Sequence, residues 1–126
     1  MKLHRDELVL FLDCTDSSHK KTLAFARSIS EHVREYSYKD YIFNRAIWFD
    51  LLQKLELRPK DLLNRADPKY QMEIAGRTFD DEAWINILIK NPCLIKAPIA
   101  VMHDKAVLCL KPKDIYKLIQ EKEYLY

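Results

Sequence analysis

The stretch "DDEAWINILIKNPCLIKAPIAVMHDKAVLCLKPKDIYKL", Asp80 to Leu118, decides the fold of this chain. Its first part predicts an amphipathic helix that Asp80 or Asp81 caps and that the Asn91-Pro92 pair stops. "APIAVM" and "KAVLCL" are typical of two strands, joined by "HDK" as a hairpin without the usual glycine. "KPKDIYKLIQEKEY" predicts a closing helix with a proline near its first turn. Helix, hairpin and helix in this order indicate an α/β domain.

The N-terminal part of the sequence predicts the other half of the sheet. "ELVLFLD" (7–13) is typical of a short buried strand, and "TDSSHKKTLAFARSISEHVREY" (15–36) of a helix with four candidate N-caps, Thr15 to Ser18. "EYSYKD" (35–40) is expected to form a second strand. "NRAIWFDLLQKLEL" (44–57) predicts an amphipathic helix, and Pro59 begins a further helical segment. The early strands should pair in parallel, with the late hairpin added to the same sheet.

Composition restricts the class of protein. The 126 residues suffice for one domain, and 48% hydrophobic with 32% charged residues is typical of a soluble globular protein. The net charge is only +2, and the basic residues are interleaved with Asp and Glu rather than gathered in a block, which gives no support for nucleic-acid binding. No apolar run approaches membrane-spanning length, and the opening is too short and too acidic for a signal peptide, so a cytoplasmic location is expected. The single glycine, Gly76, excludes a P-loop and a G-x-G-x-x-G loop.

Three cysteines, Cys14, Cys93 and Cys109, form no C-x-x-C pair and leave one thiol over in any disulfide scheme, which suits a reducing compartment. Cys93 and Cys109 are expected to be structural. No spacing of His and Cys residues indicates a metal site, and no cofactor is expected. Aromatic residues gather in one region, where an exposed subset would indicate a partner site; they are Tyr36, Tyr38, Tyr41, Phe43, Trp48 and Phe49.

"LLNRADPKY" (62–70), the stretch from Asp80 to Leu118 and the opening strand, loop and helix together resemble the arsenate reductase family. This family is a glutaredoxin-like branch of the thioredoxin fold that also contains the Spx-type transcriptional regulators. The resemblance covers nearly the whole chain and is most specific in its second half. It implies an α/β, thioredoxin-like three-layer fold with a mixed four-stranded sheet. A single domain, 1–126, is expected, with a helical insertion at roughly 43–92.

The chemistry of the family needs a thiolate at a helix N-terminus, where the helix dipole and free backbone N–H groups lower a cysteine pKa and hold an oxyanion. Aligned without gaps through "KKTLAFAR", the family's nucleophilic cysteine falls on Asp16. Cys14 falls two residues earlier, on a position that usually holds proline. A carboxylate cannot replace sulfur in the redox cycle, and Asp16 is most simply interpreted as a helix N-cap.

The resemblance also implies three arginines that grip the oxyanion, and this sequence departs from each. The first falls on Asn64, beside Arg65, and the second on Ala97, beside Lys96. The third falls on Lys111, which keeps the charge but loses the bidentate fork of arginine. Together with Asp16, these departures argue against arsenate reduction.

Further expectations concern residues around this site. The resemblance places Pro98 where thioredoxin-like folds have a cis-proline, so a cis Ala97-Pro98 bond is predicted. His19 beside Lys20 would stabilise an anion or a thiolate in a functional interpretation, but a solvated helix face is the simpler expectation.

Three functional hypotheses follow. The first is a catalytically degenerate, monomeric family member that acts as a binding or regulatory protein with an unknown protein partner and no membrane or nucleic acid. The second is a thiol-dependent oxidoreductase that uses Cys14 with glutathione or a similar thiol. The third is an Spx-like transcriptional regulator that binds a polymerase subunit, although the two-cysteine switch of those regulators is missing.

Overall fold

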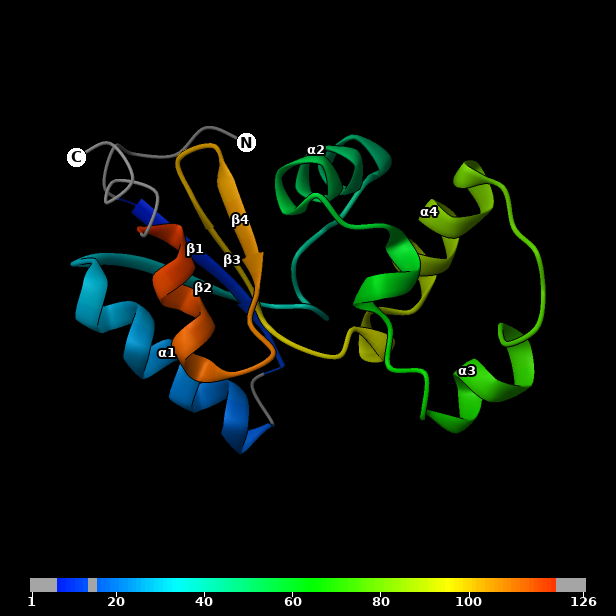
Figure 1. Cartoon of the computed structure of the whole chain (residues 1–126), viewed down its shortest axis with the longest axis horizontal. Coiled ribbons are helices and arrows are strands. Elements are labelled where there is room, and N and C mark those ends of the chain that lie inside the picture. Colours follow the sequence, from blue (N-terminus) through cyan, green and yellow to red (C-terminus); the bar gives the residue numbers. More distant parts are fainter. Residues whose placement is uncertain (1–6, 14–15, 120–126) are drawn as a thin grey trace.

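The computed structural model describes residues 7–13 and 16–119. A four-stranded mixed sheet with the order β2-β1-β3-β4 lies at its centre (Figure 1). The strands are β1 (Glu7–Leu12), β2 (His32–Ser37), β3 (Ile99–Met102) and β4 (Lys105–Leu108). β1 pairs in parallel with β2 and antiparallel with β3, and β3 pairs antiparallel with β4. The predicted mixed sheet, with early parallel strands and a late antiparallel hairpin, is confirmed.

Helices cover both faces of the sheet. α1 (Ser17–Ile29) and the 3-10 helix η3 (Pro112–Leu118) lie side by side on one face, and α2 (Arg45–Leu55) packs near β4 on the other (Figure 1). The remaining helical elements lie beyond one end of the sheet; they are η1 (Pro59–Leu62), α3 (Pro68–Glu73), α4 (Asp81–Lys90) and η2 (Pro92–Leu94). No helix within the described part of the chain is long and apolar enough to cross a membrane.

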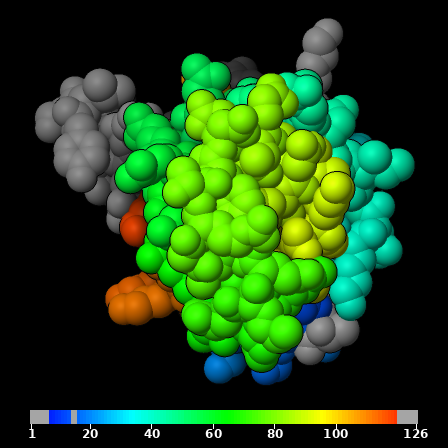
Figure 2. Space-filling view, turned by 90° about the vertical axis from the view of Figure 1, so that its right-hand side faces the viewer, coloured from blue at the N-terminus to red at the C-terminus, as the bar shows by residue number. Residues whose placement is uncertain are grey.

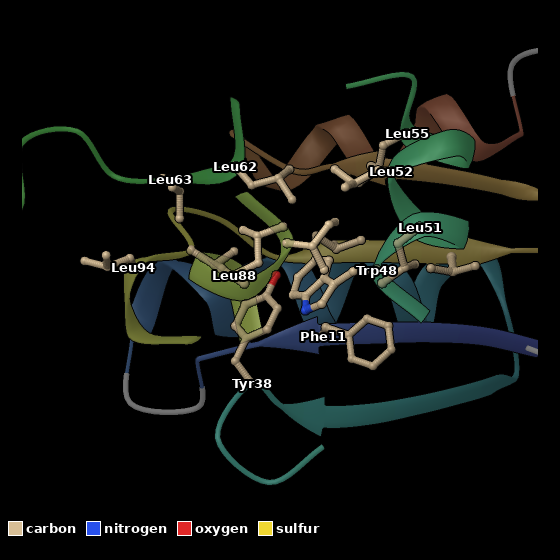
Figure 3. Packing of buried hydrophobic residues seen from close by; sticks show 14 of the residues in the cluster. Phe11, Tyr38, Trp48, Leu51, Leu52, Leu55, Leu62, Leu63, Leu88 and Leu94 are labelled. Carbon is tan, nitrogen blue, oxygen red and sulfur yellow. The ribbon is translucent and has the colours of Figure 1, made fainter. Parts of the chain in front are cut away.

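Alternation along β1 divides the apolar side chains between two cores, because successive residues of a strand point to opposite faces. Leu8, Leu10 and Leu12 pack with α1 and η3. Val9 and Phe11 pack with the larger cluster around α2 and the helices that follow it, which includes the fully buried Trp48 (Figure 3). Both faces of β1 are therefore buried, which explains its nearly continuous apolar sequence.

The boundary between the first helix and the second strand was predicted wrongly. The helix expected over 15–36 begins at Ser17 and ends at Ile29, and the strand expected over 35–40 spans His32–Ser37 instead. Val33 continues the apolar stripe of the helix in the sequence, but in the structure it pairs with Leu8 across the sheet. Strand pairing with a buried neighbour has overridden helical periodicity here.

Further differences concern short elements and their ends. α3 was not predicted, although Asp67 caps its first turn and Pro68 begins it. The second hairpin strand ends at Leu108, two residues earlier than expected. The glycine-free hairpin turn is completed by His103, which adopts a positive φ of 59°. The closing helix is a 3-10 helix that ends at Leu118 with Ile119 as its C-cap, and the part of its predicted range beyond Ile119 lies outside the described residues.

The predicted cis Ala97-Pro98 bond is wrong, because the structure has no cis peptide bond within the described ranges. The trans form is the default for an X-Pro bond by about 0.5–1 kcal/mol. The carbonyls of both residues are satisfied in this geometry. Ala97 O accepts from the Tyr38 hydroxyl at 2.7 Å, and Pro98 O accepts from Cys109 N–H at 2.8 Å. The sheet therefore forms without the cis bond.

Candidate functional site

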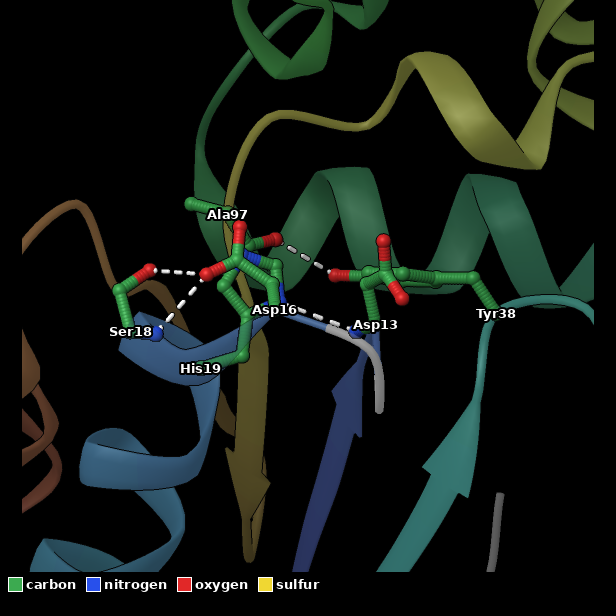
Figure 4. Close-up of polar contacts among 6 residues, drawn as sticks. All are labelled: Asp13, Asp16, Ser18, His19, Tyr38 and Ala97. Carbon is green, nitrogen blue, oxygen red and sulfur yellow. Dashed lines mark hydrogen bonds and ion pairs between the residues drawn. The ribbon is translucent and has the colours of Figure 1, made fainter.

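The candidate site lies at the end of the sheet where β1 finishes and β3 begins. β1 runs antiparallel to β3 with Phe11 opposite Ile99, and continuing this register brings Asp13 opposite Ala97. α1 starts just after β1, so its N-terminus lies at the same edge (Figure 4). This is the position at which the resemblance expects a reactive group.

Asp16 caps α1 as predicted. Its Oδ1 accepts the backbone N–H of Ser18 at 2.8 Å and the Ser18 hydroxyl at 2.6 Å (Figure 4). The backbone carbonyl of Asp16 accepts the N–H of His19 at 3.2 Å. The Ser18 hydroxyl and N–H, with a smaller contribution from His19, hold the pKa of the Asp16 carboxyl below its ordinary value. A carboxylate therefore uses the Ser18 amide, a donor that would otherwise be open to an anion.

His19 does not lie on a solvated helix face, and that expectation is wrong. Its side chain is buried, and Nδ1 accepts the backbone N–H of Asp13 at 3.0 Å. Because Nδ1 is an acceptor here, the proton of the neutral ring is on Nε2. Nε2 lies 3.7 Å from Oδ2 of Asp16. His19 thus joins the end of β1 to the cap of α1, and its neighbour Lys20 is exposed.

A short pairing of two loops brings the next candidate positions together. Leu63 and Ile95 form an isolated antiparallel bridge, flanked by bonds from Asn64 N–H to Leu94 O at 2.7 Å and from Lys96 N–H to Leu62 O at 2.9 Å. Asn64 and Ala97, on which the resemblance places two arginines, are therefore on neighbouring segments. The Asn64 side chain accepts the N–H of Ala66 at 3.1 Å, which is a local turn interaction.

Ala97 and Pro98 are buried at the start of β3, and Lys111 follows the end of β4. The bond from Cys109 N–H to Pro98 O holds the start of β3 against the end of β4. The backbone N–H of Lys111 donates to the Asp114 carboxylate at 2.9 Å, so Lys111 begins η3. Its side chain is exposed, as are those of Arg65 and Lys96.

The cysteines differ in accessibility. Burial raises the pKa of the Cys109 thiol to about 12, so this thiol is inert at neutral pH. Cys93 is exposed in η2. Cys14, the candidate nucleophile, lies outside the described residues. Across residues 7–13 and 16–119, no three His, Cys, Asp or Glu side chains gather where they would hold a metal ion.

The site contains partners that the sequence did not indicate. The buried Tyr38 hydroxyl donates to Ala97 O, and burial raises the pKa of Tyr38 well above its ordinary value. Asp13 takes part through its backbone, which sequence patterns cannot specify. The cap on Asp16 was predicted to accept the N–H of Ser18 or His19, and the Ser18 N–H does donate to it; the second bond, from the Ser18 hydroxyl, was not predicted.

Comparison with known proteins places these observations in context. The model of the ArsC family matches residues 13–118. An arsenate reductase from Vibrio cholerae is similar in structure, with a TM-score of 0.78, 18% identity, and coverage of 92% of this chain and 100% of that one. An arsenate reductase-related protein from Brucella melitensis has a TM-score of 0.67 and 16% identity, with 98% of each chain covered. No curated protein matches the sequence. At these identities the structural likeness shows the shared thioredoxin-like fold.

Proposed function

Because the chain belongs to the ArsC family, we propose that it keeps the family fold but performs no thiol redox chemistry and acts by binding a protein partner. The capping of α1 by Asp16 carries this proposal. The carboxylate stands where the resemblance expects the nucleophilic sulfur, and its bonds to Ser18 use the amide that would stabilise a thiolate or an oxyanion.

The chemistry of the two groups supports the proposal. Reduction of an oxyanion by thiols needs a sulfur that forms a bond to the substrate and is then released as a disulfide. A carboxylate has no such oxidation step. Asp16 also carries a negative charge, which repels an anion at the point where the anion would have to bind. One substitution therefore removes the nucleophile and opposes the substrate.

The residues at the expected anion grip support the same conclusion. Asn64 accepts a backbone N–H, Ala97 is a buried methyl group, and Lys111 lacks the planar fork that binds two oxygens at once. Arg65 and Lys96 keep positive charge close by in the sequence. Their exposed side chains have high conformational freedom, which does not provide a pre-organised oxyanion site.

Arsenate turnover tests the proposal. Purified protein is supplied with arsenate and with either glutathione and glutaredoxin or a thioredoxin system. The oxidation of the nicotinamide cofactor that regenerates these thiols is followed. We expect a rate equal to that of the Cys14→Ser variant and of the assay without protein. Turnover above this background that disappears in Cys14→Ser would overturn the proposal and establish a thiol-dependent reductase. A Cys93→Ser variant is the matched control for loss of an exposed thiol.

A further inference from the structure

An open groove of about 350 Å³ lies between α3 and α4, and none of its lining residues belongs to α1. The face formed by α3, α4 and the segment that joins them is turned to the viewer in Figure 2. The floor of the groove is apolar and contains Ile74, which is 5% exposed, with the half-buried Phe79 and Ile87. Met72, at 85% exposure, projects from the neighbouring turn of α3. An apolar floor that is open to solvent, with one exposed methionine on the adjoining helix, suits an apolar partner surface more than water.

The rim of the groove is positively charged. Lys69, Arg77 and Lys90 contribute three cations against the single carboxylate of Glu73. Arg77 is held in place, because its guanidinium lies over the Phe79 ring at 5.5 Å and donates to Glu73 O at 3.0 Å. Among the ion pairs of the described chain, none involves Lys69 or Lys90. Two ammonium groups are therefore available to an external carboxylate.

We propose that this groove binds an acidic amphipathic helix of a partner protein, with apolar side chains on the floor and Asp or Glu side chains on the lysines of the rim. The inference rests on the proposed function and names the surface and chemistry of its partner. An apolar floor with a charged rim is the arrangement that binds amphipathic helices in grooves. A nucleic acid would instead favour a broad basic surface with phosphate contacts, and the apolar floor provides no group that binds phosphate. The shallow opening would leave much of a small molecule in water.

A designed peptide provides the probe. It is fluorescein-labelled, with leucines at i, i+3, i+4 and i+7 and glutamates on its other faces. Binding to the full chain is measured by fluorescence anisotropy, and the contact surface is mapped by amide chemical shifts. We expect saturable binding, with shifts in α3 and α4. A peptide with lysine in place of glutamate, and one with alanine in place of leucine, should each bind at least about tenfold more weakly.

Charge variants test the rim. Lys69→Glu combined with Lys90→Glu should weaken binding at least about tenfold, whereas Lys21→Glu combined with Lys113→Glu makes the same charge change on α1 and η3 and should leave Kd unchanged. Glu73→Gln should tighten binding. The proposal is overturned if the peptide shows no saturable binding up to about 1 mM. It is also overturned if the two double variants lose peptide affinity equally, or if a single-stranded oligonucleotide binds the same lysines more tightly than the peptide does. None of these variants changes Asp16. A failure of peptide binding would therefore not alter the result of the arsenate assay, and arsenate turnover would not alter the result of the peptide-binding assay.

Discussion

Oδ1 of Asp16 lies 2.8 Å from the backbone nitrogen and 2.6 Å from the hydroxyl oxygen of Ser18, so one carboxylate oxygen accepts two hydrogen bonds at the start of α1. This relationship explains how a backbone N–H at the helix N-terminus finds a hydrogen-bond acceptor without a sulfur atom. The Ser18 amide, a free donor at a helix N-terminus, bonds to a side chain of the same chain.

Removal of the cap should destabilise the fold. Asp16→Ala deletes the acceptor for Ser18 N–H and should lower the free energy of unfolding by about 0.5–2 kcal/mol, measured by urea denaturation at neutral pH. Asp16→Asn keeps a capping oxygen and should cost less. Equal stability of wild type and Asp16→Ala would contradict the role of the carboxylate as a cap.

The stabilisation by Asp16 should depend on pH. The hydrogen bonds from Ser18 lower the folded-state pKa of the Asp16 carboxyl below its ordinary value, so the contribution is fully present above the unfolded pKa and is lost as pH falls through the folded pKa. The difference in unfolding free energy between wild type and Asp16→Asn should therefore be largest near neutral pH and shrink in acid. A difference that grows as the pH falls would show that the carboxylate is not stabilised by folding.

His19 should matter for stability through its acceptor nitrogen. His19→Ala leaves the Asp13 N–H without the 3.0 Å bond to Nδ1 and empties a buried position, which should cost about 1–3 kcal/mol. Lys20→Ala, the exposed neighbour, is the matched control and should stay within about 0.5 kcal/mol of wild type. Equal effects of the two substitutions in urea denaturation would be inconsistent with the buried bond.

The Tyr38 hydroxyl should stabilise the start of β3. Tyr38→Phe leaves Ala97 O without its 2.7 Å donor in a buried setting and should cost about 1–3 kcal/mol. Tyr116→Phe removes a hydroxyl that lies 3.4 Å from the Ser28 hydroxyl on the surface, and should change stability by less than about 0.5 kcal/mol. Thermal or urea denaturation of both variants measures the difference. An unchanged stability of Tyr38→Phe would refute the stabilising role of the Tyr38 hydroxyl.

Restoring sulfur should not restore activity. A thiol at position 16 would meet the N–H of Ser18 at the end of the helix dipole, so Asp16→Cys should give a thiol pKa below the free value of about 8.5. Arsenate turnover should remain close to background, because Asn64 and Ala97 provide no guanidinium for the anion. Substantial turnover in this single variant would show that the missing arginines are not needed.

Much of the fold was predictable because its signals are local and redundant. Short apolar runs bounded by turn residues predicted β1 and the β3–β4 hairpin, and Asp80 caps α4 through Ala83 N–H as expected. The end of α1 was not predictable, because the pairing of Val33 with Leu8 depends on the sheet. Local periodicity contains no information on that pairing.

The candidate site was predictable only in part. Asp16 was identified as the cap because capping depends on residue type and position, both of which the sequence contains. The burial of His19 and the bond from Tyr38 to Ala97 arise between segments that are distant in the sequence or depend on the path of the backbone. The cis bond at Pro98 was inferred from resemblance alone, and the local geometry did not require it.

The thiol pKa of Cys14 tests the absence of thiolate chemistry most directly. The rate of alkylation is measured against pH in a Cys93→Ser variant, which removes the exposed thiol, while Cys109 stays unreactive because burial raises its pKa to about 12. The account predicts that Cys14 titrates near the free-thiol value of about 8.5, and that Asp16→Ala in the same background leaves arsenate turnover at zero. A Cys14 pKa well below about 7, together with turnover that Cys14→Ser abolishes, would contradict the account and make the protein a thiol-dependent reductase.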